Sequence, residues 1–491
     1  MNQNIRIGLT FDDVLLVPKR FSGTSRSKIS TKTNFSRKIS LNIPIISSNM
    51  DTVTEANMAI ILAREGGMGV IHRFMPINDQ VQECVRVKRS ESIVIDRPYT
   101  LLSSATLFDA KKLMKDKDVS GILITSKDGI LEGILTHRDL KFETNYSQQI
   151  EKIMTQKNKL ITAPPTTSLE EAKSILSNNK IEKLPLIENN GRLVGLITAS
   201  DIEKRQLSPN ATKDNKGRLR VAAAIGVKDD YLERAKALLE VSVDSIVVDI
   251  AHGHSDLAIN TVKRLRKEFG NEIDICAGNV ATKDGTSDLI AAEVDSIKVG
   301  VGPGSICVTR IVAGSGVPQI TAIMDCAEVA ADAGVPLISD GGIRTSGDIA
   351  KALAAGASTV MIGNLLAGTT ESPGSPIIRN GRKYKVIRGM ASLGASLGRQ
   401  SREKEAVEKK GSFDDMDIDD FASSVVPEGV EAMVPFRGNA KEILTQLVGG
   451  LRSGISYCGA TSLEEMRKKA EFIQVTFAGL KESRSHDVET V

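Results

Sequence analysis

One loop of the chain has the composition expected around a reactive cysteine. Cys307 ends the run Gly300-Val-Gly-Pro-Gly-Ser-Ile-Cys, whose three glycines let the backbone approach a ligand closely. Lys298 and Arg310 are near in sequence and would favour the thiolate, which is the nucleophilic form of cysteine. A lone cysteine is, however, more often a small buried hydrophobic residue. The loop alone therefore leaves both a catalytic and a structural role for Cys307 open.

Two further loops have the composition of a phosphate site. They are Asp340-Gly-Gly-Ile-Arg344 and Gly363-Asn-Leu-Leu-Ala-Gly368, and each begins at the end of an apolar run. Glycine amides and helix N-termini bind phosphate well, although Gly-Gly also forms simple tight turns. Asp340, and Asp249 at the end of another apolar run, would each accept hydrogen bonds from ribose hydroxyls. Together these features favour a nucleotide as the ligand.

Eight short β-branched runs alternate with segments of helical periodicity. This alternation predicts parallel βαβ units, and eight of them predict an α/β fold, a (β/α)8 TIM barrel with functional groups at the carboxyl ends of its strands. In such barrels the loops after strands seven and eight frequently bind phosphate. The alternative is an open doubly wound sheet, but Gly300-Val-Gly-Pro-Gly lacks the context of a dinucleotide fingerprint. The predicted strands are 44–47, 67–72, 220–226, 245–249, 274–279, 296–300, 336–340 and 359–363.

A weak internal repeat interrupts the barrel pattern between residues 94 and 206. Ile130-Leu-Glu-Gly-Ile-Leu-Thr-His-Arg-Asp-Leu140 matches Arg192-Leu-Val-Gly-Leu-Ile-Thr-Ala-Ser-Asp-Ile202. The repeat resembles a tandem pair of CBS modules, which in many proteins bind adenine or guanine nucleotides. The resemblance implies that Thr136, Asp139, Thr198 and Asp201 contact ribose, whereas Thr-x-x-Asp can also be a plain helix cap. The predicted domains are barrel segments 1–93 and 207–491 around CBS modules 94–150 and 151–206.

Composition excludes several classes of protein. A net charge of +3 over 491 residues is too close to neutral for a nucleic-acid-binding protein. No apolar run is long enough for a membrane span, and the N-terminus lacks the apolar stretch of a signal peptide. The five cysteines include no CxxC pair, which disfavours zinc or a disulfide framework. We therefore expect a cytoplasmic protein with neither a membrane nor a nucleic-acid partner.

Several longer motifs, spread over nearly the whole chain, resemble the family of inosine-5′-monophosphate dehydrogenases and guanosine-5′-monophosphate reductases. The dehydrogenase resemblance implies that Cys307 attacks C2 of inosine 5′-monophosphate (IMP) and that hydride passes to NAD⁺. Hydrolysis of the resulting thioimidate then yields xanthosine 5′-monophosphate, in guanine nucleotide biosynthesis. A thiolate suits such covalent catalysis. Besides the Cys307 loop and the CBS pair, the motifs are Leu9-Thr-Phe-Asp-Asp-Val-Leu-Leu-Val-Pro18, Asn49-Met-Asp-Thr-Val-Thr54, Arg388-Gly-Met-Ala-Ser392, Pro427-Glu-Gly-Val-Glu431 and Ala478-Gly-Leu-Lys-Glu-Ser483.

The same resemblance implies roles for individual residues. Thr309 and Glu428 match a proton relay of the family. The family is usually tetrameric, so we expect a homotetramer in which a neighbouring subunit's tail completes a potassium site. That site would consist of the carbonyls of Gly300, Gly302 and Cys307 together with Glu482 and Ser483. The residues implied on the cofactor side are Asp249, Asn279, Gly300 and Gly302. Those implied in substrate binding are Ser48, Met50, Ser305, Asp340, Gly341, Gly342, Gly363, Asn364, Arg388, Gly389, Met390 and Glu428.

One departure from the family pattern concerns water activation. A charged, irregular stretch at about 391–426 predicts a mobile lid, and family dehydrogenases usually carry an adjacent Arg-Tyr pair there. No such pair occurs in this lid, and the candidates for an unpaired arginine are Arg399 and Arg402. Milder departures are Asn49, Asn364, Ile387 and Ala391.

The missing pair leaves an NADPH-dependent GMP reductase as the alternative, because the reductase also lacks it. The CBS pair, the tail and the long lid favour the dehydrogenase. A nucleotide-sensing CBS protein on an inactive barrel belongs to a different class. The presence of Cys307, Thr309, Asp340 and Glu428 disfavours that interpretation.

Overall fold

The computed structural model describes residues 5–91, 95, 98–200, 202, 208–392 and 426–483. The chain divides into two compact units. The first comprises Met1–Lys88, Asn210–Asp214 and Leu219–Val491, and the second comprises Arg89–Pro209 and Asn215–Arg218.

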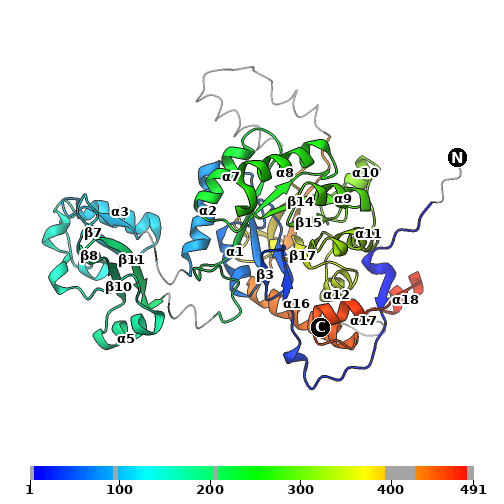
Figure 1. The fold of residues 1–491 in the computed structure, drawn as a ribbon, viewed down its shortest axis with the longest axis horizontal. Coiled ribbons are helices and arrows are strands. Elements are labelled where there is room, and N and C mark those ends of the chain that lie inside the picture. Colours follow the sequence, from blue (N-terminus) through cyan, green and yellow to red (C-terminus); the bar gives the residue numbers. More distant parts are fainter. Residues whose placement is uncertain are drawn as a thin grey trace, which may run out of the picture. The chain divides into compact units, whose positions relative to one another are not determined.

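The first unit is built on a closed barrel of parallel strands, in the order β12-β13-β14-β15-β16-β17-β4-β5 (Figure 1). Every strand predicted from the sequence is present, so the predicted α/β TIM-barrel class is confirmed. The strands are β4 (Ile45–Ser47), β5 (Met68–Ile71), β12 (Val221–Ile225), β13 (Ser245–Asp249), β14 (Ile275–Val280), β15 (Ser296–Val299), β16 (Leu337–Asp340) and β17 (Thr359–Ile362).

Helices cover the outside of the barrel (Figure 1). Several begin at side-chain caps that satisfy free backbone N–H groups, as where the Thr345 hydroxyl accepts from the Asp348 N–H at the start of α12. The long helices are α1 (Ala56–Arg64), α2 (Ile77–Arg89), α7 (Tyr231–Glu240), α8 (Asp256–Phe269), α9 (Lys283–Ala291), α11 (Gln319–Asp332), α12 (Ser346–Ala354) and α16 (Ala440–Tyr457). Shorter ones are α10 (Thr309–Val312), α13 (Asn364–Ala367), α17 (Leu463–Lys469) and α18 (Phe477–Glu482).

Alternate strand residues fill the barrel interior. Ala222 and Ala224 on β12 belong to the interior cluster with Val247, whereas Ala223 belongs to the cluster that includes the surrounding helices. Phe35 is fully buried in the interior cluster, and the neighbouring Ser36 hydroxyl donates to Asp274 just before β14. The amino-terminal end of the barrel is therefore closed by side chains, which leaves the carboxyl ends of the strands to form the site.

A three-stranded antiparallel sheet extends from the barrel after β17. It consists of β18 (Ile377–Arg379), β19 (Arg382–Arg388) and β20 (Glu431–Pro435), and β19 pairs with both neighbours. We call β19 and β20 with their adjoining residues 389–392 and 426–430 the arm. The arm matters for the site because its two strands lead to Met390 and Glu428.

The second unit contains two similar halves. In one, α3 (Leu107–Lys117) precedes the hairpin β7 (Gly121–Thr125) and β8 (Leu131–Thr136); in the other, α5 (Leu169–Asn179) precedes β10 (Lys183–Ile187) and β11 (Leu193–Thr198). Asp139 Oδ2 accepts from the backbone N–H and hydroxyl of Thr136, at 2.8 and 2.7 Å, and so caps α4 (His137–Leu140). The predicted residue Asp201 lies outside the described part of the chain.

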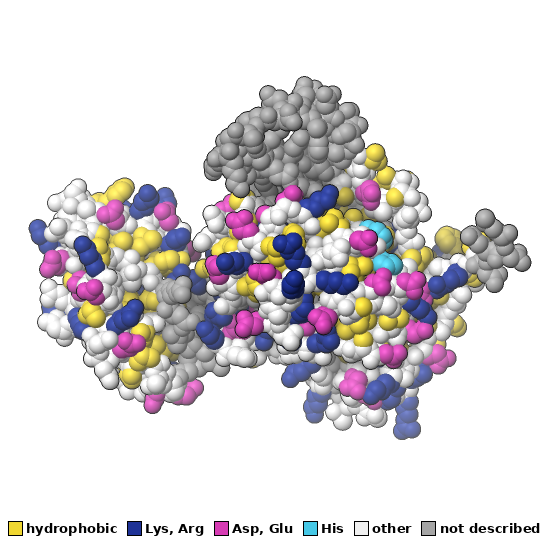
Figure 2. All heavy atoms as spheres, turned by 45° about the horizontal axis from the view of Figure 1, so that its top comes forward, with side chains coloured by type: hydrophobic (Ala, Val, Ile, Leu, Met, Phe, Trp, Pro, Cys, Tyr) yellow, Lys and Arg dark blue, Asp and Glu magenta, His cyan; other side chains and the backbone are white. Residues whose placement is uncertain are grey.

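The surface carries no single-sign charge field on the face shown in Figure 2, where basic and acidic side chains are interspersed. This distribution agrees with the net charge of +3. Among the described residues, no helix has both the length and the apolar character needed to cross a membrane.

Candidate active site

Cys307 is the accessible cysteine of the chain. It lies in the loop between β15 and α10 and is partly exposed, whereas Cys84, Cys276, Cys326 and Cys458 are buried. Burial raises the pKa of Cys326 to about 11 and that of Cys276 to about 12, so neither forms a thiolate near neutral pH. The position at the carboxyl end of a barrel strand therefore leaves Cys307 as the candidate nucleophile.

The Cys307 thiol, the Thr309 hydroxyl and the Glu428 carboxylate form a chain of hydrogen-bond contacts. Cys307 Sγ lies 3.2 Å from Thr309 Oγ1, which donates to Glu428 Oε2 at 2.8 Å. Backbone contacts fix this geometry, since the Val308 N–H donates to the Glu428 carbonyl at 2.9 Å. A hydroxyl has one proton to donate, so Thr309 can pass a proton to Glu428 only by accepting another. The arrangement has the form of a proton relay.

A buried ammonium holds together the two carboxylates predicted to bind ribose. Lys298 Nζ lies 3.2 Å from Asp249 Oδ1 and 2.9 Å from Asp340 Oδ2. Asn279 Nδ2 also donates to Asp340 Oδ2, at 2.9 Å. Burial acts to raise the pKa of Asp249, but Lys298 and Arg73 outweigh it and hold that pKa below its usual value. Asp249 is therefore an ionised acceptor for hydroxyl groups.

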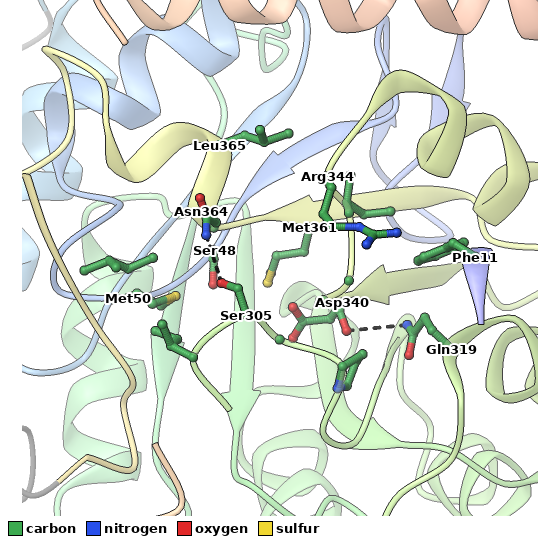
Figure 3. A pocket seen from close by; sticks show the side chains of 18 of the residues that line it. Phe11, Ser48, Met50, Ser305, Gln319, Asp340, Arg344, Met361, Asn364 and Leu365 are labelled. Atoms are coloured by element: carbon green, nitrogen blue, oxygen red, sulfur yellow. Dashed lines mark hydrogen bonds between the residues drawn. The ribbon is translucent and has the colours of Figure 1, made fainter. Parts of the chain in front are cut away.

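The predicted phosphate loops line a cavity of about 540 Å³ (Figure 3). Asp340, Gly341, Gly342, Gly363 and Asn364 lie around it with Ser48, Met50 and Ser305. Gly341 has φ of +96°, and a Cβ there would lie 3.0 Å from the Gly304 backbone nitrogen, so the close approach of the two loops requires glycine. Asn364 Nδ2 donates to Ser305 Oγ at 3.1 Å, which joins the Cys307 loop to the loop after β17.

A second cavity, of about 530 Å³, adjoins the first. Met50, Gly304 and Asp340 line both cavities. The second is also lined by Cys307, Thr309 and Glu428, and by all four residues predicted on the cofactor side: Asp249, Asn279, Gly300 and Gly302. The thiol and its relay therefore lie where a nucleotide in one cavity would meet a ligand in the other.

The arm closes one side of the site through the predicted residues Arg388, Gly389 and Met390. The Arg388 guanidinium forms an ion pair with Asp51, and Met390 Sδ accepts from the Asp51 N–H at 3.5 Å. The Gly389 N–H donates to the Val430 carbonyl at 3.0 Å. Arg388 is thus ion-paired with a residue of the loop after β4, whereas Gly389 and Met390 line the second cavity.

Some predicted residues are not brought to the site. Glu482 ends α18 and Ser483 is its C-cap, and neither lines the cavities of its own chain. The prediction assigns both residues to the potassium site of a neighbouring subunit. Arg399 and Arg402, and most of the predicted lid, lie outside the described residues. In the described ranges, no cluster of three or more His, Cys, Asp or Glu side chains is placed to hold a metal ion.

Sequence reasoning missed several residues of the second cavity, among them Arg73 and Phe74. They follow β5, and their position after a barrel strand was the available signal. The Arg73 guanidinium carbon lies 4.8 Å from the centre of the Phe74 ring, and Arg73 helps to keep Asp249 ionised. Lys298 was considered only as a neighbour of Cys307, whereas it lies between Asp249 and Asp340.

Known proteins resemble the chain over its whole length. The family described as the IMP dehydrogenase / GMP reductase domain matches residues 8–486. Inosine-5′-monophosphate dehydrogenase of Nitrosopumilus maritimus is 52% identical, over 98% of each chain, and that of Aquifex aeolicus is 50% identical, over 100% of this chain and 97% of its own. GMP reductase of Leishmania major is 48% identical, over 98% of this chain and 97% of its own.

A solved structure also resembles the chain over its whole length. A GMP reductase variant from Trypanosoma brucei, in complex with guanosine 5′-monophosphate, superposes with a TM-score of 0.91 at 44% identity and covers 100% of both chains. The family match and the structural likeness both cover nearly the whole chain. The chain is therefore an enzyme of the IMP dehydrogenase / GMP reductase family.

Proposed function

We propose that the enzyme oxidises IMP to xanthosine 5′-monophosphate with NAD⁺, through a covalent bond between Cys307 and the purine. The observation that carries the proposal is the line from Cys307 through Thr309 to Glu428, at the junction of two cavities. One cavity carries the glycine loops suited to a nucleotide phosphate, and the other offers space beside the thiol for a dinucleotide.

The residues of the chain divide the reaction into two steps. In the first, Cys307 Sγ bonds to C2 of the purine and the hydride on C2 departs, leaving a thioimidate. In the second, water adds to C2, its proton passes through Thr309 to Glu428, and the C–S bond breaks to release product and restore the thiolate. Covalent catalysis of this kind replaces one difficult step by two easier ones. Asp340 would meanwhile hold the ribose hydroxyls.

The second cavity fits a nicotinamide cofactor. Bound NAD⁺ would supply the acceptor for the hydride. Asn279 Oδ1 is buried without a hydrogen-bond partner, so an amide N–H donor from a ligand would satisfy it. The ionised Asp249 would accept from ribose hydroxyls, and the loop that carries Gly300 and Gly302 lines the same cavity.

The second candidate is NADPH-dependent reduction of guanosine 5′-monophosphate. Close relatives bear the name GMP reductase, the sequence from 391 to 426 contains no Arg-Tyr pair, and the Thr309–Glu428 relay would serve this reaction as well. The long segment at 391–426, which we propose is a lid, and the 52% identity with a dehydrogenase favour the first candidate. In the dehydrogenase, Arg399 or Arg402 would be a second base for water.

Two parallel assays decide between the candidates. Purified protein receives IMP with NAD⁺ in one, and guanosine 5′-monophosphate with NADPH in the other. NADH and xanthosine 5′-monophosphate are expected in the first. Ammonia and NADP⁺ in the second, with no reaction in the first, would establish the reductase. Silence in both would leave a nucleotide-sensing protein on an inactive barrel, and full turnover by Cys307→Ala would remove the thiol from the mechanism.

We also propose a potassium site and a regulatory unit. Carbonyl oxygens suit a hard monovalent cation, and positive φ values at Gly300 and Gly302 turn the loop that would present them. In a homotetramer the tail residues Glu482 and Ser483 of a neighbouring subunit would complete the site; replacing KCl by choline chloride should then lower turnover. We propose that the second unit is a tandem CBS pair that binds adenine or guanine nucleotides at Thr136 and Asp139 in one module and at Thr198 and Asp201 in the other. Calorimetric titration with ATP and GTP tests that proposal.

A further inference from the structure

Lys385 is a buried cation in the middle of the arm. Lys385 is 2% exposed and lies on the inner face of β19. Among the described residues no carboxylate forms an ion pair with it, although the Glu371 carboxylate attracts it electrostatically. Its Nζ instead donates to two backbone carbonyls, those of Thr369 at 3.0 Å and Ser372 at 2.6 Å. Buried ammonium groups are rare and usually paired with acids. The direct contacts of the Lys385 ammonium are thus backbone carbonyls and not an ion pair, which is uncommon for a buried lysine.

The two carbonyls belong to a rigid turn. Residues 369–372 follow α13, the helix that begins after Gly363 in the first cavity. The Ser372 hydroxyl lies 2.7 Å from the Ala367 carbonyl and 2.9 Å from the Thr369 carbonyl, and it can donate its one proton to either. The Thr369 hydroxyl donates to the Leu366 carbonyl at 2.8 Å. The turn is thus fixed to α13, and the ammonium joins β19 to it.

The strand β19, which carries Lys385, leads to one side of the site. Arg388, three residues after Lys385, ends β19 and is followed closely by Met390. The strand β20 is hydrogen-bonded to β19 and begins shortly after Glu428. The outer face of the arm is open, with Val386 and Met433 exposed by 43% and 37%. The Arg388–Asp51 ion pair and backbone hydrogen bonds to the Cys307 loop fasten the arm at its site end, and Lys385 supplies the charged contact on its inner face.

We infer that Lys385 is a positioning residue whose ammonium fixes the arm to the turn after α13 and so keeps Glu428 and Met390 in register with Cys307. The inference rests on the proposed function for the roles of Glu428 and Cys307. An apolar side chain would fill the same space, but it would take away the donor of the buried Ser372 carbonyl and leave the Thr369 carbonyl with the Ser372 hydroxyl alone. Lys385 touches no reacting atom, so its effect reaches the chemistry only through the arm.

The test compares Lys385→Met with Val434→Ala. Val434 lies opposite Lys385 on β20 and is 5% exposed, so its truncation weakens the same ladder but keeps the ammonium. We expect Lys385→Met to lower kcat about tenfold or more with little change in the KM of the nucleotide, because the glycine loops stay in place. Val434→Ala should lose stability but keep most of its kcat.

Hydrogen exchange supplies a readout that does not need turnover. Amides of 386–392 should exchange about tenfold faster in Lys385→Met than in wild type, and less so in Val434→Ala. Unchanged exchange, unchanged kcat, or equal losses in both variants would overturn the inference. If wild type catalyses neither reaction, the proposed function fails and exchange alone decides the positioning role. If Lys385→Met does not fold, Ser372→Ala loosens the same turn and should give the same two effects, smaller in size.

Discussion

Replacing Lys298 by methionine tests the charge network at the centre of the site. The side chain is 4% exposed and contacts Asp249 and Asp340, whose side chains are 18% and 20% exposed. Methionine is similar in size but leaves both carboxylates without the ammonium. Removing one partner of a buried ion pair costs about 3–5 kcal/mol. Because both acids keep some access to water, we expect a loss of about 3 kcal/mol, at the lower limit.

The loss should depend on pH in a defined direction. In wild type the pKa of Asp249 is lowered, so its ionised form stabilises the fold above the unfolded-state pKa, about 4, and that contribution disappears as the pH falls. Without Lys298, burial acts to raise the pKa, and ionisation of Asp249 then opposes folding. The difference in stability between wild type and variant should therefore widen from about pH 5 to about pH 8.

Differential scanning calorimetry across this range measures the difference as a shift in the melting temperature of the barrel unit. The double variant Lys298→Met/Asp249→Asn is the matched control, because it removes one of the two unpaired carboxylates and should recover part of the lost stability at about pH 8. A shift of equal size at every pH, with no recovery in the double variant, would mean that Lys298 contributes packing alone and would refute the reasoning.

Three further predictions address the relay, the closed end of the barrel and the thiols. Glu428→Gln keeps an acceptor for Thr309 but takes up no proton, so steady-state kcat should fall about 100-fold with little change in the KM of the nucleotide. A loss below about threefold that replacement of Arg399 and Arg402 does not enlarge would contradict the relay. Burial raises the pKa of Asp274 to about 6, so its ionised form opposes folding above that pH. Asp274→Asn should accordingly raise the melting temperature at about pH 8, by the equivalent of about 3 kcal/mol, and have no effect at about pH 4, where equal effects would rule out the charge. Alkylation followed by peptide mapping should label Cys307 well before Cys326; equal rates would show that burial does not control these thiols.

The barrel could be predicted from sequence because its strands are local features. The run from Ser245 to Asp249 matches β13 residue for residue, and the Cys307 loop follows β15 as expected. The relay is different, since Thr309 and Glu428 are 119 residues apart and no local pattern joins them. Only the resemblance to a family suggested that pair. The ion pair between Asp51 and Arg388, 337 residues apart, had no local signal at all.

Lys385 shows how a pattern of polarity can mislead. A lysine within an alternating strand is ordinarily assigned to the exposed face, and a valine to the buried one. In β19 the order is reversed, because Lys385 is buried and Val386 is exposed. The reversal follows from the carbonyls of Thr369 and Ser372, which accept hydrogen bonds from the Lys385 ammonium. The turn that contains them is close to β19 in both sequence and space. Whether a charged side chain is buried thus depends on hydrogen-bond acceptors elsewhere in the chain, which the residue pattern of the strand itself does not reveal.

The size of the Glu428→Gln effect also distinguishes one base from two. The described residues join Cys307 to a single proton acceptor. If Glu428 acts alone, losing it removes the whole relay, and a further change at Arg399 or Arg402 adds little. If an arginine of 393–425 activates water in parallel, Glu428→Gln loses less, and the double variant loses far more than either single one. Because the reductase reaction adds no water to the purine, only the dehydrogenase should show the parallel pattern. The comparison of single and double variants therefore reports how many bases act and whether the second step is the addition of water.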